Sequence, residues 1–171
     1  RRINPNPVFD PAEVTRLVKA GVKALTEMQL ADGGWGWFSG YGERSGPHTT
    51  ATIVHGLTLA KANDVAIVPG VYQKAGGWLK RYQQKQRTRL TNAATKTKPF
   101  KSRADNIDAL VFRVLVDTGS IDRQMGDFLF RDRIGLSTYG KGLLGLALHR
   151  MQDPQRLAIV MKNIDQFLQQ D

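Results

Sequence analysis

The sequence contains no cysteine, and this absence excludes several kinds of chemistry together. Without thiols, the 171 residues cannot form a disulfide, a zinc–thiolate site or a thiol nucleophile. The chain also lacks any run of about 20 consecutive apolar residues, the length that a helix needs to cross a membrane. Its first residues, Arg-Arg-Ile-Asn-Pro, do not contain the apolar stretch of a secretory signal. We expect no metal ion, no cofactor and no insertion into a membrane.

Acidic residues are missing from the middle of the chain. Residues 65–104 contain ten basic residues and no Asp or Glu, and they account for the whole net charge of +10. Such a patch attracts anionic partners over about one Debye length. The candidate binding residues are Lys80, Arg81, Lys85, Arg87, Arg89, Lys98, Lys101 and Arg103. Only Tyr82 and Phe100 could stack on bases, so we favour an acidic domain or loop of the same parent protein over nucleic acid. The alternative, to which we give equal weight, is that these residues form an ordinary solvated surface without a partner.

The spacing of apolar residues predicts seven helices and no strand of useful length. Four segments, which begin near residues 10, 71, 121 and 153, carry apolar side chains on one face, and the second of them is predicted to end at Gln86. The three segments between them, residues 47–62, 106–116 and 137–149, are apolar nearly all round, which predicts burial on all sides. Outer amphipathic helices that alternate with inner buried helices predict an all-α fold, a partial α/α toroid. An irregular bundle or a solenoid of helix pairs is the alternative.

The clearest local motif is Gln-Leu-Ala-Asp-Gly-Gly-Trp at residues 29–35, between the first outer segment and the first inner one. Asp32 and the two glycines allow a tight reversal with positive φ, and Gln29 can bond free helix carbonyls. The aromatic residues can pack across the joint between the layers, so the motif is interpreted as structural. The alternative is an aromatic-lined site for a carbohydrate or terpenoid, made by Trp35, Trp37 and Phe38.

This motif resembles the repeat motif of terpenoid cyclases, protein prenyltransferase β-subunits and the thioester domains of complement and alpha-2-macroglobulin proteins, which are all α/α toroids. Two further stretches, residues 104–109 (Ala-Asp-Asn-Ile-Asp-Ala) and residues 128–141, are most similar to bacterial alpha-2-macroglobulins. The resemblance spans nearly the whole chain in helix order and loop placement. It implies that residues 1–171 are a single domain, a fragment of an α/α-toroid domain of the thioester type. It also implies a periplasmic, extracellular or cell-surface location.

The function that the resemblance implies is the trapping and inhibition of proteases in bacterial cell defence. The thioester of this family needs a Cys-x-Glu-Gln motif ahead of the first helix, so that motif lies before Arg1 or is absent from the parent protein. Complement-type relatives also use a histidine just ahead of the segment 106–116, where residues 97–103 contain none. We expect a module that is not an enzyme and has no catalytic residue. Its partners would be target proteases, reached through the parent protein, and neighbouring domains of the same parent chain.

Other residues that could carry chemistry have simpler structural explanations. Asp105 and Asp108 lie three apart near a helix start, where a cap and the helix dipole account for them better than acid catalysis does. Residues 140–145 match the glycine spacing of a dinucleotide-binding fingerprint but follow no strand, so these glycines are expected to allow close helix packing. The histidines are interpreted as a cap or loop residue (His48), a hydrogen-bonded core residue (His55) and a residue that favours a helix C-terminus (His149).

Two alternative functions remain open at this point. An α/α-toroid enzyme that acts on a terpenoid or a glycan would use the aromatic cluster and the acid pair. The Asp-x-Asp-Asp motif of the cyclases and the cysteine ligand of the prenyltransferase zinc site are both missing, which disfavours that alternative. A binding module for nucleic acid or for an acidic surface would use the basic patch.

Overall fold

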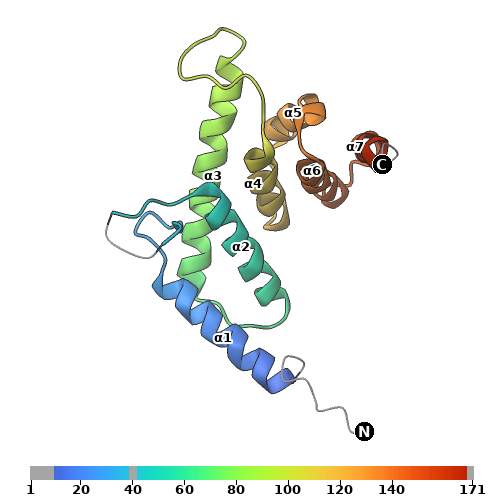
Figure 1. Ribbon diagram of the computed structural model, residues 1–171. Coiled ribbons are helices and arrows are strands. Elements are labelled where there is room, and N and C mark those ends of the chain that lie inside the picture. The colour runs from blue at the N-terminus through green and yellow to red at the C-terminus, as the bar shows by residue number, and fades with distance from the viewer. Residues whose placement is uncertain (1–9, 39–41, 169–171) are drawn as a thin grey trace, which may run out of the picture.

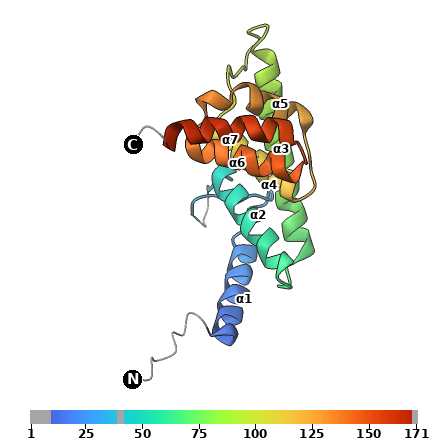
Figure 2. The same ribbon diagram turned by 90° about the vertical axis from the view of Figure 1, so that its right-hand side faces the viewer.

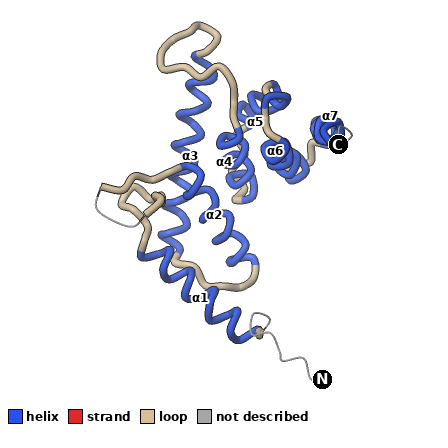
Figure 3. The backbone as a smooth tube through the Cα atoms, viewed as in Figure 1, coloured by secondary structure: helices blue, strands red, loops and turns tan. Residues whose placement is uncertain are grey.

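The computed structural model describes residues 10–38 and 42–168, and every regular element in this part of the chain is helical (Figures 1 and 3). The all-α prediction is therefore confirmed. The elements are α1 (Pro11–Glu27), α2 (Pro47–Ala62), α3 (Pro69–Asn92), α4 (Asn106–Asp117), α5 (Arg123–Arg131), the 3-10 turn η2 (Arg133–Gly135), α6 (Thr138–Arg150) and α7 (Pro154–Leu168). Phe167 and Leu168, predicted on the apolar stripe of the last helix, lie outside the residues whose side chains are described.

Short polar side chains cap the first turns of several helices. Asp10 accepts a hydrogen bond from the Ala12 N–H at 2.8 Å, and proline occupies the first helical position of α1. Asp122 caps α5 and Ser137 caps α6 in the same way. These caps satisfy N–H groups that have no partner inside their helix.

α4 lies at the centre of the packing. It contacts α2, α3, α5 and α6, and eight of its twelve residues are buried. Phe112 and Leu115 have no exposed surface. The prediction that residues 106–116 form an enclosed helix is confirmed.

The other helices are arranged around a row made of α2, α4 and α6. α2 contacts α4 and α4 contacts α6, while α3 packs on both α2 and α4. α1 packs on α2, α5 packs on α3 and α4, and α7 lies along α6, as Figure 2 shows. Successive helices therefore alternate along the chain between the row and its flanks.

Two of the three helices predicted to be enclosed have an exposed side. Leu59 and His55 of α2 are exposed, and so is Leu146 of α6, because none of the described helices covers that side of the row. The prediction of burial all round is wrong for α2 and α6, since an apolar pattern does not reveal whether a partner is present. His55 is consequently not a core residue, and its Nδ1 lies 3.9 Å from Asp117 Oδ2.

α1 and α3 also depart from a regular bundle. α1 contributes no buried residue, and the apolar stripe that the sequence predicts there is only half covered, with Leu17 exposed and Leu25 packed on the core. α3 runs to Asn92, past the predicted end at Gln86, because Leu90 anchors its last turns in the core. The end of α3 and the loop of residues 93–105 extend beyond the other helices (Figure 1).

Candidate functional site

The aspartate of the 29–35 motif is the centre of a hydrogen-bonded turn. One carboxylate oxygen of Asp32 accepts from the Ser45 hydroxyl at 2.6 Å and from the Gly34 N–H at 3.1 Å, and the other accepts from the Trp78 indole N–H at 2.9 Å. Burial works to raise the pKa of Asp32, but the hydrogen bonds from Ser45, Gly34 and Trp78 outweigh it and hold the pKa below its ordinary value. Asp32 therefore joins the loop before α2 to α3 and is not held as a free acid.

Gln29 and Gly33 bring the same turn against the start of α3. Gln29 Nε2 donates to the carbonyls of Gly33 and Val71, both at 2.9 Å. The sequence predicts bonds to free helix carbonyls, and the observed acceptors are instead one turn carbonyl and one carbonyl in the first turn of α3. Gly33 has φ of +94°, and a Cβ built on it would lie 2.8 Å from the Lys74 carbonyl oxygen. The turn thus requires glycine on two independent grounds.

We expect Gly33→Ala to lower the free energy of unfolding by about 2 kcal/mol, because it adds a backbone clash to the cost of positive φ. Gly119→Ala is the matched control, since Gly119 also has positive φ but a Cβ there would meet no atom within 4 Å. That control should cost about 1 kcal/mol. Urea unfolding followed by far-UV circular dichroism measures both values, and equal losses would remove the close approach from the explanation.

The three aromatic residues predicted as a cluster are not brought together as one site. Trp35 is only 2% exposed, and its indole N–H donates to the Leu25 carbonyl at 2.8 Å. Trp37 and Phe38 are instead 76% and 70% exposed. Only Trp35 covers the joint as predicted, so a ligand could reach two of the three rings but not the third.

Asp105 and Asp108 form a capping box at the start of α4. Asp105 accepts from the backbone N–H groups of Ile107 and Asp108 at 3.0 Å each, and Asp108 accepts from the Asp105 N–H at 3.0 Å. Lys101 Nζ lies 2.7 Å from Asp105 and 2.6 Å from Asp108. The two acids therefore start the helix and hold the loop before it.

The environments of these two acids push their pKa values apart. Burial raises the pKa of Asp108, against the hydrogen bond from Lys101. Burial also acts to raise the pKa of Asp105, but the bonds from Lys101 and from the backbone prevail and lower it. A divergent pair of this kind is what acid–base catalysis uses, yet Lys101 already occupies the space between the two carboxylates. The geometry favours the structural interpretation.

The linker between α5 and α6 is tied to the start of α4. Asp132 accepts from the Ala104 N–H at 2.8 Å, and Asn106 Oδ1 accepts from the Ser137 N–H at 3.0 Å. A Cβ on Gly140 would lie 2.2 Å from Asn106 Oδ1, so this glycine does allow close packing as predicted. Gly142 and Gly145 have room for a methyl group, which corrects the prediction for those two positions. Residues 104–109 and 128–141, two of the motifs identified in the sequence, therefore meet here.

The remaining polar candidates do not gather into a site. His48 is exposed in the first turn of α2, and His149 is exposed in the last turn of α6. No group of three or more His, Cys, Asp or Glu side chains in residues 10–38 and 42–168 is placed to hold a metal ion. No helix in the same part of the chain is long and apolar enough to cross a membrane.

The basic patch keeps most of its charge unpaired. Arg87 forms an ion pair with Asp122 at 3.0 Å, and Lys101 pairs with the two acids of α4. Within the described residues, no carboxylate oxygen lies within 4.0 Å of the other six cations, which are Lys80, Arg81, Lys85, Arg89, Lys98 and Arg103. Three of the six, Arg81, Lys85 and Arg89, follow one another at four-residue intervals on α3. They lie on one helix face, which we call the cationic face of α3.

A groove runs along this face. Its first part is a hollow of about 280 Å³ between Asp32, Trp78 and Tyr82, and its second is a hollow of about 330 Å³ that reaches Asn92 and Pro99. Arg81 and Lys85 line both hollows, so the two lie next to each other along α3. We call the two together the α3 groove.

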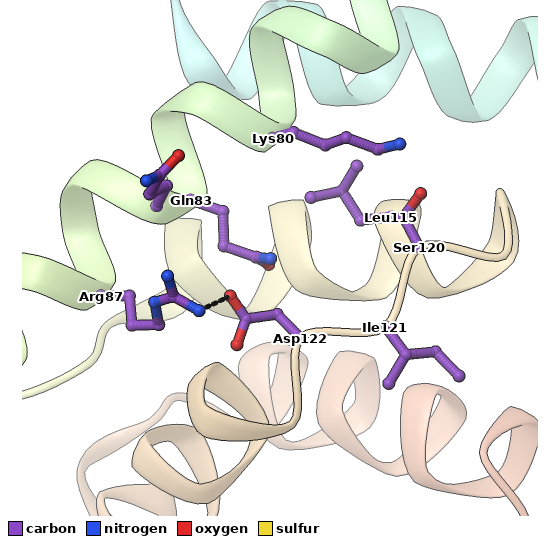
Figure 4. A pocket seen from close by; sticks show the side chains of 8 residues that line it. Lys80, Gln83, Arg87, Leu115, Ser120, Ile121 and Asp122 are labelled. Carbon is purple, nitrogen blue, oxygen red and sulfur yellow. Dashed lines mark hydrogen bonds and ion pairs between the residues drawn. The ribbon is translucent and has the colours of Figure 1, made fainter.

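A separate hollow lies on the neighbouring side of α3 (Figure 4). Lys80, Gln83 and Arg87 reach it from α3, and Ser120 and Asp122 reach it from the loop before α5. The Arg87–Asp122 pair closes one end, and Asp122 also accepts from the Met125 N–H at 3.1 Å. Arg87 therefore serves to position α5, unlike the three cations of the α3 groove.

No family model, no curated protein and no solved structure matches the chain. The functional interpretation of the α3 groove accordingly depends on its own charge and shape. The sequence identifies its cations, but it does not identify the other residues of the second hollow, which are Gln84, Thr88, Asn92 and Pro99. Continuing the helix past Gln86 to the true end of α3 would have placed Thr88 and Asn92 near the cations, but no sequence signal points to Pro99 on the loop.

Proposed function

We propose that this chain is a non-enzymatic docking module of a bacterial protease trap of the alpha-2-macroglobulin type. The observation that carries the docking role is the row of Arg81, Lys85 and Arg89 on α3, which form no ion pair within the described residues. Unpaired like charges on one face repel each other, and an anionic partner removes that repulsion. The partner we propose is an acidic domain or loop of the same parent protein.

The proposed architecture is part of an α/α toroid. We propose that α2, α4 and α6 belong to its inner layer, and that α1, α3, α5 and α7 belong to its outer layer. The contacts along the row and the alternation of helices between row and flanks support this assignment. The exposed sides of α2 and α6 also support it, because the inner helices of a toroid face a cavity that further helices enclose.

The proposal assigns structural tasks to the motifs that carry the family resemblance. The 29–35 motif joins α1 to α2 and α3 through Asp32 and Gln29. The acid pair of residues 104–109 and the linker of residues 128–141 meet at the start of α4. These contacts fix the helices relative to one another. A protease trap needs such a rigid domain, because the domain has to transmit the rearrangement that follows cleavage.

A toroid enzyme that acts on a terpenoid or glycan has weaker support from the same geometry. Lys101 bonds both Asp105 and Asp108, and the most buried ring of the aromatic trio, Trp35, is covered. Any thioester would need a cysteine that this chain does not contain. The contribution of this chain to a reactive domain would therefore be the helical scaffold. We propose that the parent protein is periplasmic or extracellular.

The test of the proposed function is the DNA sequence on both sides of the coding region for these residues. We expect it to encode macroglobulin-type β domains in the same reading frame. A reading frame that contains this helical domain alone would overturn the proposal. A Cys-x-Glu-Gln motif before the first helix would make the parent a covalent trap, and its absence would make the parent a purely conformational trap.

A further inference from the structure

We infer that the α3 groove binds an extended peptide segment that carries acidic side chains at alternate positions. This inference rests on the docking role proposed above, but it does not depend on the family. It specifies the partner's backbone conformation and the spacing of its charges, which the net charge of the patch does not.

The spacing of the cations selects an extended partner. Arg81, Lys85 and Arg89 follow one another every four residues along α3, which corresponds to about 6 Å along the helix axis. In an extended chain, side chains on the same side repeat every second residue, or about every 6.6 Å. Three carboxylates at alternate positions can therefore reach three successive cations without a change of register.

The length of the groove sets the length of the segment. From Trp78 to Asn92 the groove follows α3 for about 21 Å, at about 1.5 Å per residue. An extended chain of about six residues covers that distance. Two of the alternate positions would then lie over Arg81 and Lys85, which line both hollows.

Both ends of the groove are held by the fold. At one end the rings of Trp78 and Tyr82 are stacked, with centroids 5.8 Å apart, and the Trp78 N–H bonds Asp32. At the other end the Asn92 side chain donates to the Pro99 carbonyl at 3.2 Å, so the loop after α3 forms a wall. A groove that is already formed costs a partner less ordering free energy on binding.

The groups around the cations leave their charge available. Arg81 donates to the backbone carbonyl of Asp32 at 2.9 Å, and its charge helps to lower the pKa of the Asp32 carboxyl without forming an ion pair within 4.0 Å. Lys85 is exposed, and within the described residues no carboxylate lies within 4.0 Å of it or of Arg89. The Asp32 carboxylate at the Trp78 end is the one acid that lines the groove, so we expect the partner's first acidic residue to lie beyond it, over Arg81.

An acidic peptide fits this groove better than a nucleic acid does. Single strands bind through exposed aromatic rings on which their bases stack. Here Trp78 and Tyr82 are half-buried and stacked on each other, so their faces are not open to bases. Phe100, which is exposed, lies on the loop beyond Pro99 and is not part of the lining.

The experiment measures binding of fluorescein-labelled peptides by fluorescence anisotropy at low salt. The probe peptide is Gly-Glu-Thr-Glu-Thr-Glu-Gly, and its control, Gly-Thr-Glu-Glu-Glu-Thr-Gly, has the same composition but only two glutamates on one side. We expect the probe to bind at least threefold more tightly than the control peptide. We expect the triple variant Arg81→Glu, Lys85→Glu and Arg89→Glu to lose at least tenfold in affinity for the probe.

A charge-matched variant distinguishes a loss of affinity caused by the groove from one caused by the change in net charge. Lys19→Glu, Lys23→Glu and Lys162→Glu change the charge equally at exposed positions of α1 and α7, and should change the affinity less than twofold. If the groove triple variant does not fold, Lys85→Glu alone replaces it, because Lys85 is exposed, and a threefold loss is expected. Equal losses in both triple variants, equal binding of the two peptides, or tighter binding of a thymidine oligonucleotide would each overturn the inference. The gene sequence that tests the family is independent of all these results.

Discussion

Replacing Trp35 with alanine should lower the free energy of unfolding by about 3–5 kcal/mol, the range for truncation of a large buried aromatic residue. Trp35 is 2% exposed and lies in the core cluster, and its indole N–H donates to the Leu25 carbonyl. Its backbone N–H also donates to Thr50 Oγ1 at 3.0 Å, which fixes the ring between α1 and α2. The substitution leaves a cavity and removes the indole N–H donor from the Leu25 carbonyl.

Trp37→Ala is the control for this prediction, since Trp37 follows Trp35 by two residues and is 76% exposed. It should change the free energy of unfolding by no more than about 0.5 kcal/mol. Urea unfolding followed by far-UV circular dichroism reports both values without depending on tryptophan fluorescence. Similar losses for the two variants would mean that the 29–35 turn does not form the joint as described.

The second large effect is expected at the start of α4, where Lys101→Met should cost about 3 kcal/mol. The Asp108 side chain is fully buried, and one of its oxygens has no hydrogen-bond partner among the described residues. The Lys101 ammonium group at 2.6 Å is the cation that balances this carboxylate. The expected loss lies at the lower end of the range for a broken buried pair, because 21% of the Lys101 side chain is exposed.

The dependence of this loss on pH identifies its cause. Burial raises the pKa of Asp108 in the folded protein above its ordinary value of 3.8. Removing Lys101 should raise that pKa further, since the charged form loses its partner. The loss in free energy of unfolding is therefore greatest above the pKa of Asp108 in the folded variant. It falls as the pH is lowered from that pKa to the lower pKa of Asp108 in the folded wild type, which itself lies above 3.8. Urea unfolding measured at neutral and at acidic pH should show a smaller difference in free energy of unfolding between the wild type and Lys101→Met at the acidic pH.

Two further variants complete the test. Lys101→Met combined with Asp108→Asn should recover most of the lost free energy at neutral pH, because no uncompensated charge remains buried. Lys98→Met, on the same loop but exposed, should have an effect within about 0.5 kcal/mol. A loss for Lys101→Met that is independent of pH and is not recovered by Asp108→Asn would mean that Lys101 acts only through the packing of its side chain.

Much of the helical framework could be predicted because local signals specify it. The spacing of the apolar residues placed the starts of the helices close to their observed residues. The turn at residues 29–35 was also predictable, because Asp favours tight turns and Gly tolerates the positive φ that such a turn needs. These are interactions between residues that are near one another in the chain.

The features that could not be predicted depend on contacts between residues that are far apart in the sequence. Arg87 and Asp122 are 35 positions apart, and neither sits in a pattern that requires the other. The exposed sides of α2 and α6 carry the same apolar residues that would be buried if another helix covered them. The extension of α3 to Asn92 follows from the burial of Leu90, which only the packed structure reveals. The α3 groove, made partly by this extension, could therefore be predicted only as a patch of charge.

The unequal burial of α1 and α4 has a consequence for how the chain opens. With no buried residue, the first turns of α1 are held mainly by their own backbone hydrogen bonds, whereas α4 has neighbours on every side. Amide hydrogens in those turns of α1 can exchange with solvent through local fraying, but those of α4 can exchange only when the surrounding helices separate. The first turns of α1 are thus a region of low local stability, which can unfold and refold while the rest of the domain, including the end of α1 at Leu25, stays folded.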